Sequence, residues 1–131
     1  MLNLKMVAGA HQEQVSSIAH AAATATEYIA KIRVPFTGYL KKVIFVPDAA
    51  VTGQDTNTTN LNVVNLGTGA GTTELYNYDL TNGNNVAVTG YEFGSTKTAV
   101  TEGGFIGLQA EKVSTGLAIP AGTFICEFWG G

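Results

Sequence analysis

A glycine-rich run is the first segment of the chain whose spacing could do chemistry. Gly67, Gly69 and Gly71 alternate with small residues directly after the strand-like segment 61–66, and a loop of this kind can bind phosphate through backbone N–H groups. The run lacks the Lys-Ser/Thr ending of a P-loop, and the strand-like segment 73–80 follows it instead of a helix. Because no helix begins there, the segment lacks the free N–H groups and the dipole of a helix N-terminus, which bind anions. We predict a turn between two strands.

Two groups of polar residues have side chains that can bind cations. The segment 55–60 places oxygen atoms at alternate positions, and Asp48 could join them from across the loop. The segment has neither the glycine at the sixth position nor the closing glutamate of an EF-hand. His11 and His20, the only two histidines, do not share a helix face, and no Cys or carboxylate lies between them at ligand spacing. We therefore expect no metal and no other cofactor.

Residues for acid–base and nucleophilic catalysis are present, but no spacing assembles them. Neither histidine comes from the β-rich part of the chain that would have to orient a Ser-His-Asp triad. Cys126 lies in the apolar run 123–129, where a thiol is more often a small buried hydrophobe than a nucleophile. Nor does any spacing select two carboxylates for glycoside hydrolysis from Glu74, Asp79, Glu92, Glu102 and Glu111. The sequence predicts a protein that is not an enzyme.

Aromatic residues are the better candidates for a functional surface. Tyr76 and Tyr78 would share one face of their strand with Leu80, which favours the core or a contact between subunits over a platform for sugars. We therefore take both tyrosines as candidate interface residues.

The closing strand predicts a further contact residue. Phe124, Cys126 and Phe128 occupy alternate positions and should face the core. Trp129 then lies on the outer face beside Glu127, and exposed tryptophans are frequent anchors of protein interfaces. Trp129 is our leading interface candidate.

Composition and charge limit the partners. Charged residues make up 13% of the chain and the net charge is −3, whereas a quarter is usual for a soluble domain. Nucleic-acid binding needs clustered basic residues, but the seven present are scattered, and the adjacent Lys41 and Lys42 should point to opposite faces of a strand. No apolar run approaches the roughly 18 residues of a membrane span. We expect no nucleic acid and no membrane as partner, and a homo-oligomer within a larger assembly.

The first 25 residues differ from the rest of the chain. The segment 11–26 is rich in Ala and Gln and has Val15, Ile18 and Ala22 at helical spacing, but its apolar face is thin. We predict either an N-terminal arm over residues 1–25 that orders against a neighbouring subunit, or a short helix. Val15 and Ile18 are the candidate contact residues in both cases.

From residue 26 onward the pattern is that of short strands. Apolar and polar residues alternate over 28–36, and turn signals such as Asn82-Gly83 recur about every ten residues. We predict one domain over residues 26–131, an all-β antiparallel β-sandwich that is jelly-roll-like. An Ig-like sandwich is the alternative, although Cys126 and Trp129 share one strand and so lack the Cys–Trp–Cys spacing of true immunoglobulin domains.

Six motifs also carry a family resemblance through their order and spacing. They are residues 36–38 (FTG), 46–57 (VPDAAVTGQDTN), 61–66 (LNVVNL), 67–73 (GTGAGTT), 114–118 (STGLA) and 120–122 (PAG). In this succession, which covers roughly residues 30–131, the chain resembles a family of small β-sandwich proteins that decorate phage capsids. Each motif by itself is only a turn with a strand edge.

The resemblance implies a function and a location. A decoration protein of this kind is a viral structural protein that binds the outer capsid surface and stabilises the head, so its partner would be the major capsid protein. The resemblance also implies a homo-oligomer, with a trimer favoured, that is made in the host cytoplasm and resides on the capsid exterior of the virion. The alternatives are another phage structural component, such as a head fibre or tail protein, and a carbohydrate- or receptor-binding β-sandwich module.

Overall fold

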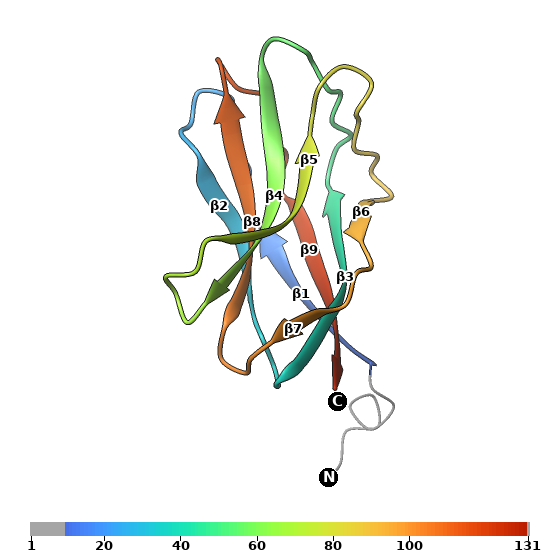
Figure 1. Ribbon diagram of the computed structural model, residues 1–131. Helices are drawn as coiled ribbons and strands as arrows, with labels where there is room; N and C mark the ends of the chain where they lie inside the picture. Colours follow the sequence, from blue (N-terminus) through green and yellow to red (C-terminus); the bar gives the residue numbers. More distant parts are fainter. Residues whose placement is uncertain (1–9, 131) are drawn as a thin grey trace.

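Two antiparallel β-sheets pack face to face and form a sandwich (Figure 1). The computed structural model describes residues 10–130, which contain strands and no helix. The five-stranded sheet has the order β1-β9-β3-β6, with β7 also paired to β3, and the four-stranded sheet has the order β2-β8-β4-β5. The strands are β1 Ala10–Ser17, β2 Glu27–Arg33, β3 Gly38–Pro47, β4 Thr58–Gly67, β5 Thr73–Asp79, β6 Tyr91–Gly94, β7 Thr98–Val100, β8 Phe105–Val113 and β9 Gly122–Gly130.

Strands from the first half of the chain pair with strands from the second half in a nested order. β1 pairs with β9, β2 with β8, β3 with β6, and β4 with β5. Such a nested antiparallel ribbon, whose successive pairs alternate between two sheets, is a jelly roll. The predicted all-β, jelly-roll-like sandwich is therefore confirmed.

The core lies between the two sheets and follows the alternation of the strands. Phe124, Cys126 and Phe128 on β9 are completely buried, as the alternation predicts, while Trp129 is 40% exposed. The opposite sheet contributes buried Leu61 from β4 and other aliphatic side chains. Each large apolar side chain buried in this way contributes about 1.5–3 kcal/mol, so the inner faces fix the strand register.

The N-terminal segment is part of the sandwich from residue 10 onward, which corrects the expected arm or short helix over residues 1–25. β1 pairs with β9 along its whole length and faces Val15 toward the core beside Phe124. The alternation is hard to see in the sequence because other inward positions of this edge strand, among them Glu13 and Ser17, are polar. Residues 1–9 lie outside the described residues.

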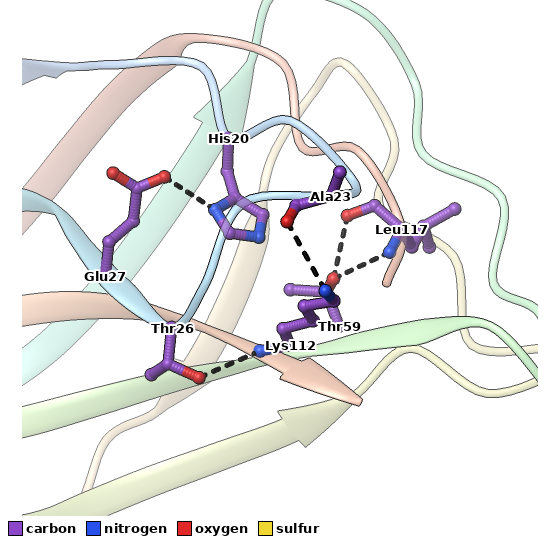
Figure 2. Close-up of polar contacts among 7 residues, drawn as sticks. All are labelled: His20, Ala23, Thr26, Glu27, Thr59, Lys112 and Leu117. Carbon is purple, nitrogen blue, oxygen red and sulfur yellow. Dashed lines mark hydrogen bonds and ion pairs between the residues drawn. The ribbon is translucent and has the colours of Figure 1, made fainter. Parts of the chain in front are cut away.

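A buried histidine holds the connection between β1 and β2 in place (Figure 2). His20 is 1% exposed, and its Nδ1 lies 2.7 Å from Oε2 of Glu27 at the start of β2. The backbone N–H groups of His20 and Ile119 each donate to the other residue's carbonyl oxygen, both at 2.8 Å. Residues 18–26 are thus fastened to the segment that precedes β9.

Lys112 and Thr59 complete this junction (Figure 2). The Lys112 Nζ donates to the carbonyl oxygen of Ala23 at 3.3 Å, and the Lys112 backbone N–H donates to Thr26 Oγ1 at 3.2 Å. Thr59 Oγ1 donates to the Leu117 carbonyl and accepts from the Leu117 N–H. These bonds tie the N-terminal connection to β8 and to the segment before β9, and they tie that segment to β4. The first strand and the rest of the domain should therefore unfold together.

Other strands differ from the sequence prediction in detail. A bulge at Ile29 shifts the register of β2, so that Tyr28 lies opposite Gln109 on the outer face, whereas the alternation placed it with the core residues. Val86 takes part only in a single β-bridge, with Val51. β7 is a strand that we did not predict from the sequence.

The two faces of β9 lead to a first test. Phe128→Ala should lower the free energy of unfolding by about 3–5 kcal/mol, because a fully buried ring leaves a cavity. Trp129→Ala, one residue along on the outer face, should cost about 1 kcal/mol or less. Chemical denaturation of both variants measures the difference. A larger loss for Trp129→Ala would show that the register is shifted by one residue.

The two histidines offer a matched test of the N-terminal junction. His20→Ala should cost about 2–4 kcal/mol, because it empties a buried site and removes the bond to Glu27. His11→Ala is the control, since the pair of His11 with Glu13 is partly exposed and should contribute less than about 1 kcal/mol. Equal losses in thermal or chemical unfolding would refute the special role of His20.

Candidate functional site

The glycine-rich segment after β4 is a hairpin connection, as predicted. Gly67 and Gly69 have positive φ angles of 53° and 129°, which glycine adopts without strain. The N–H groups of Gly69 and Gly71 both donate to the carbonyl oxygen of Leu66, at 3.0 and 2.8 Å. Because these N–H groups already have acceptors within the turn, they do not form a phosphate cradle.

The polar loop between β3 and β4 uses its side chains to shape itself. The Asp55 carboxylate accepts a hydrogen bond from the Asn82 N–H at 2.9 Å, and Thr58 donates to the carbonyl oxygen of Leu80. Within residues 10–130, no group of three or more His, Cys, Asp or Glu side chains is placed to hold a metal ion. The part of the chain that the structure describes also has no helix long and apolar enough to cross a membrane.

The tyrosines predicted as interface residues pack inward at the open side of the sandwich. Tyr78 from β5 stacks on Tyr91 from β6, with ring centroids 3.8 Å apart and an interplanar angle of 8°. The Tyr78 hydroxyl donates to the Asn85 carbonyl, and the Tyr76 hydroxyl donates to the Thr96 carbonyl. Burial raises the pKa of both stacked tyrosines, and for Tyr78 the neighbouring Tyr91 raises the pKa further. These rings close the gap between β5 and β6.

The remaining predicted contact residues differ in how far their side chains are exposed. Val15 is partly buried against the core, whereas Ile18 is 56% exposed in the connection after β1 and Trp129 is 40% exposed on β9. Of the five predicted interface residues, Trp129 is the one with other aromatic and charged side chains arranged around it. It marks the candidate functional site.

Trp129 and Tyr39 form the centre of an outward-facing cluster on the five-stranded sheet. Tyr39 on β3 is the cross-strand partner of Trp129 on β9, so the two side chains share the outer face. The Lys97 ammonium lies 4.0 Å from the centre of the Tyr39 ring, and the Lys41 ammonium lies 6.0 Å from the centre of the Trp129 ring. Both lysines are thus at cation–π distance. We call Tyr39, Trp129, Lys41 and Lys97 the aromatic–lysine cluster.

A β-bulge in β3 brings adjacent lysines to this face, which corrects the prediction that Lys41 and Lys42 point in opposite directions. Leu40 pairs with Phe128 and Lys42 pairs with Glu127, so Lys41 is the extra residue between them. Lys41 lies over Trp129, while the Lys42 Nζ is 3.9 Å from Oε1 of Glu92 on β6. Bulges often re-aim side chains next to functional sites.

Two carboxylates on the face are already engaged. Glu127 accepts a hydrogen bond of 2.7 Å from the indole Nε1 of Trp129, and Glu92 forms the ion pair with Lys42. The bond from Glu127 orients the indole, which leaves its apolar ring for contact with a partner. Among the described residues, Lys42 forms an ion pair with Glu92, while His11 and His20 are hydrogen-bonded to Glu13 and Glu27. Lys41 and Lys97 take no part in these contacts.

A cleft of about 380 Å³ borders the cluster beside Tyr39. It lies where β3 and β7 pair, and Gly38 is required there because a Cβ atom would clash with the Trp129 carbonyl oxygen. Its lining combines apolar side chains with two threonines: Thr37, Gly38, Tyr39, Ala99, Val100 and Thr101. A small side chain of a partner could enter this cleft while the rest of the partner contacts the rings.

A smaller pocket of about 250 Å³ lies on the outer face of the opposite sheet, between Tyr28, Phe105 and the β4–β5 turn. A Cβ atom at Gly107 would come within 2.9 Å of the Tyr28 ring and of Leu66. The Tyr28 ring therefore lies directly on the backbone of the sheet, which is a packing role. This makes the opposite face the weaker candidate.

Sequence reasoning missed Tyr39 and Lys97 as members of the site. Tyr39 opens a strand directly after a Thr-Gly turn, and Lys97 lies in the connection between two short strands. Strict alternation back from the buried Val43 and Phe45 would place Tyr39 on the core side, and the bulge at Lys41 turns it outward. Neither this reversal nor the pairing of residue 39 with residue 129 could be seen in the sequence.

Comparison of the chain with protein-family models, with curated proteins and with solved structures gave no match. The resemblance to capsid decoration proteins therefore stays a prediction.

The lone thiol gives a test of the claim that β9 carries no reactive nucleophile. Burial raises the pKa of Cys126, and the thiolate is the reactive form. Cys126 should not react with a thiol reagent such as DTNB at pH 8 until the protein is unfolded in guanidinium. Since the unfolded chain loses this proton first, stability should also decline as the pH rises above about 8.5. Rapid labelling of the native protein would contradict this burial.

Proposed function

We propose that this protein is a non-enzymatic structural component of a phage particle that binds the outer surface of the capsid and stabilises the head. Two kinds of observation support the proposal. The ordered motifs over residues 30–131 resemble capsid decoration proteins, and the jelly-roll sandwich presents a ready-made contact surface on one sheet. The observation that carries the proposal is the aromatic–lysine cluster, with Tyr39 and Trp129 side by side on an outward sheet face.

The physical character of the cluster favours a protein partner. Tryptophan and tyrosine dominate the energy of protein interfaces, because a rigid ring buries a large area at a small cost in entropy. Sugar platforms need a free ring face, but Lys97 lies over Tyr39 and Lys41 lies over Trp129. A protein surface can instead contact the rings and the lysines at the same time.

The proposed mechanism is the addition of interface area to an assembled shell. The major capsid protein would supply the surface opposite the aromatic–lysine cluster, and a closed cyclic oligomer, with a trimer favoured, would contact several capsid subunits together. Internal pressure would then have to break these added contacts before the shell opens. The stabilisation follows mass action and increases with occupancy of the sites.

A carbohydrate- or receptor-binding module is the second candidate. The cleft beside Tyr39 favours it, since two threonines, Thr37 and Thr101, line it together with an aromatic residue. A head-fibre or tail component, the other structural role, would use the same face on a different partner.

Binding to shells tests the proposed function. The purified protein should co-sediment with capsid shells of the phage that encodes it, and Trp129→Ala should weaken binding at least about tenfold. Val88→Ala is the matched control, because Val88 is also an exposed apolar residue, at 53%, but lies in the turn before β6. Its binding should equal that of the unchanged protein.

Three results would refute the proposal or redirect it. Absence of the protein from shells would refute the capsid role, and binding to tail fractions instead would support the tail alternative. Selective binding to a glycan array that Trp129→Ala abolishes would favour the carbohydrate-binding module.

A further inference from the structure

The charges around the aromatic–lysine cluster indicate what kind of partner surface fits it, and this inference rests on the proposed function. Three of the seven basic residues of the chain, Lys41, Lys42 and Lys97, lie on this outer face, although the chain as a whole has a net charge of −3. This face of an acidic protein therefore carries three lysines beside two glutamates, Glu92 and Glu127. Complementary charge on a partner raises the rate and specificity of association.

Two of these lysines differ from the third in their local contacts. The Lys42 Nζ lies 3.9 Å from the Glu92 carboxylate, and the neighbouring Glu127 accepts a hydrogen bond of 2.7 Å from the Trp129 indole. Lys41 and Lys97 take part in no ion pair among the described residues, and each lies over an aromatic ring instead. An ammonium held over a ring keeps its charge and can still donate hydrogen bonds.

The bulge in β3 is a second, independent observation. In a regular strand Tyr39 and Lys41 would share one face and Lys42 would point to the other. The register shift between Leu40 and Lys42 places both lysines on the face that carries Tyr39. A bulge interrupts the ladder locally, so this arrangement uses backbone geometry to place charge beside the aromatic rings.

We propose that the partner protein contacts this face through an acidic segment whose carboxylates bind Lys41 and Lys97 on either side of the Tyr39–Trp129 pair. An apolar side chain of the same segment would enter the cleft beside Tyr39, which Ala99 and Val100 line. Contact with the rings excludes water from the two ion pairs, which strengthens them relative to exposed pairs.

A protein segment fits this face better than a phosphate backbone does. Glu127 and Glu92 lie on the same face as the lysines, and a continuous run of phosphates would meet these carboxylates. Carboxylates spaced along a folded segment can reach the two free lysines and avoid the two glutamates. The mixed signs of charge thus favour a patterned partner over a uniformly anionic one.

Charge reversal on the two lysines tests the inference. The double variant Lys41→Glu/Lys97→Glu should bind shells at least about tenfold more weakly than the unchanged protein at low salt. Raising NaCl from about 50 to 300 mM should weaken shell binding of the unchanged protein far more than that of the variant. Salt screens the attraction between lysines and carboxylates, which the variant no longer has. Lys31→Glu is the matched control, since Lys31 also lies over a ring, Tyr28 at 5.5 Å, but on the opposite sheet. Its shell binding should not change, and both variants should retain the circular dichroism spectrum and melting temperature of the folded protein.

Peptides separate failure of this inference from failure of the proposed function. Synthetic peptides in which Glu alternates with Leu should bind the unchanged protein, whereas matched peptides with Gln in place of Glu, and the double lysine variant, should show no binding.

The possible results have distinct meanings. If shells bind the protein but charge reversal leaves the affinity unchanged, the acidic segment is refuted and the capsid role stands. If shells do not bind the protein, the capsid role is refuted, and the peptides decide by themselves whether the face recognises carboxylates. Equal binding of Glu and Gln peptides, or preferential binding of a phosphorylated peptide or DNA, would overturn the inference.

Discussion

The double pairing of β9 is the interaction on which the rest of the structure depends. β9 lies between β1 and β3, and antiparallel ladders run along both of its edges. Its inner face contributes two phenylalanines and a cysteine, all completely buried, to the centre of the core. Because β1 and β9 are the first and the last strands of the described residues, the jelly roll closes only when these distant segments pair. The nested pairs β2–β8 and β4–β5 follow from this arrangement.

The candidate functional site is a consequence of the same register. Burial of Phe128 requires Trp129 to face outward, and the pairing of β9 with β3 then places Tyr39 beside it. The rings are therefore held by two central strands of a sheet, which makes the surface rigid. A rigid face loses little conformational entropy when it binds a partner, so more of the contact energy contributes to affinity. The proposed roles in capsid binding and in recognition of an acidic segment both use this preorganisation.

The N-terminal strand β1 is an exposed edge of the five-stranded sheet, and its residues discourage pairing with other chains. β1 is an edge strand with polar residues among its inward positions, and inward-pointing charge is one way in which proteins discourage pairing between exposed edges. Glu13 fits that role, and the buried His20 holds the segment after the strand against β2 and the approach to β9. This edge is therefore built to stay paired within its own chain, and the outer face of the five-stranded sheet is the better surface for contact with others.

The sequence by itself determined the fold class and the orientation of its most regular strands. Alternation over the closing strand identified Phe128 as core and Trp129 as surface, and glycine and asparagine spacing identified the hairpin after β4, because these signals depend only on neighbours along the chain. The tertiary structure alone decided that residues 10–17 form a strand, that a bulge brings Lys41 to the same face as Lys42, and that Tyr39 meets Trp129. Each of these depends on pairing between segments far apart in the chain, where the free energy of burial and of backbone hydrogen bonds overrides weak local preferences. The candidate site was therefore only partly visible in the sequence, since one of its two rings was identified and the residues that surround it were not.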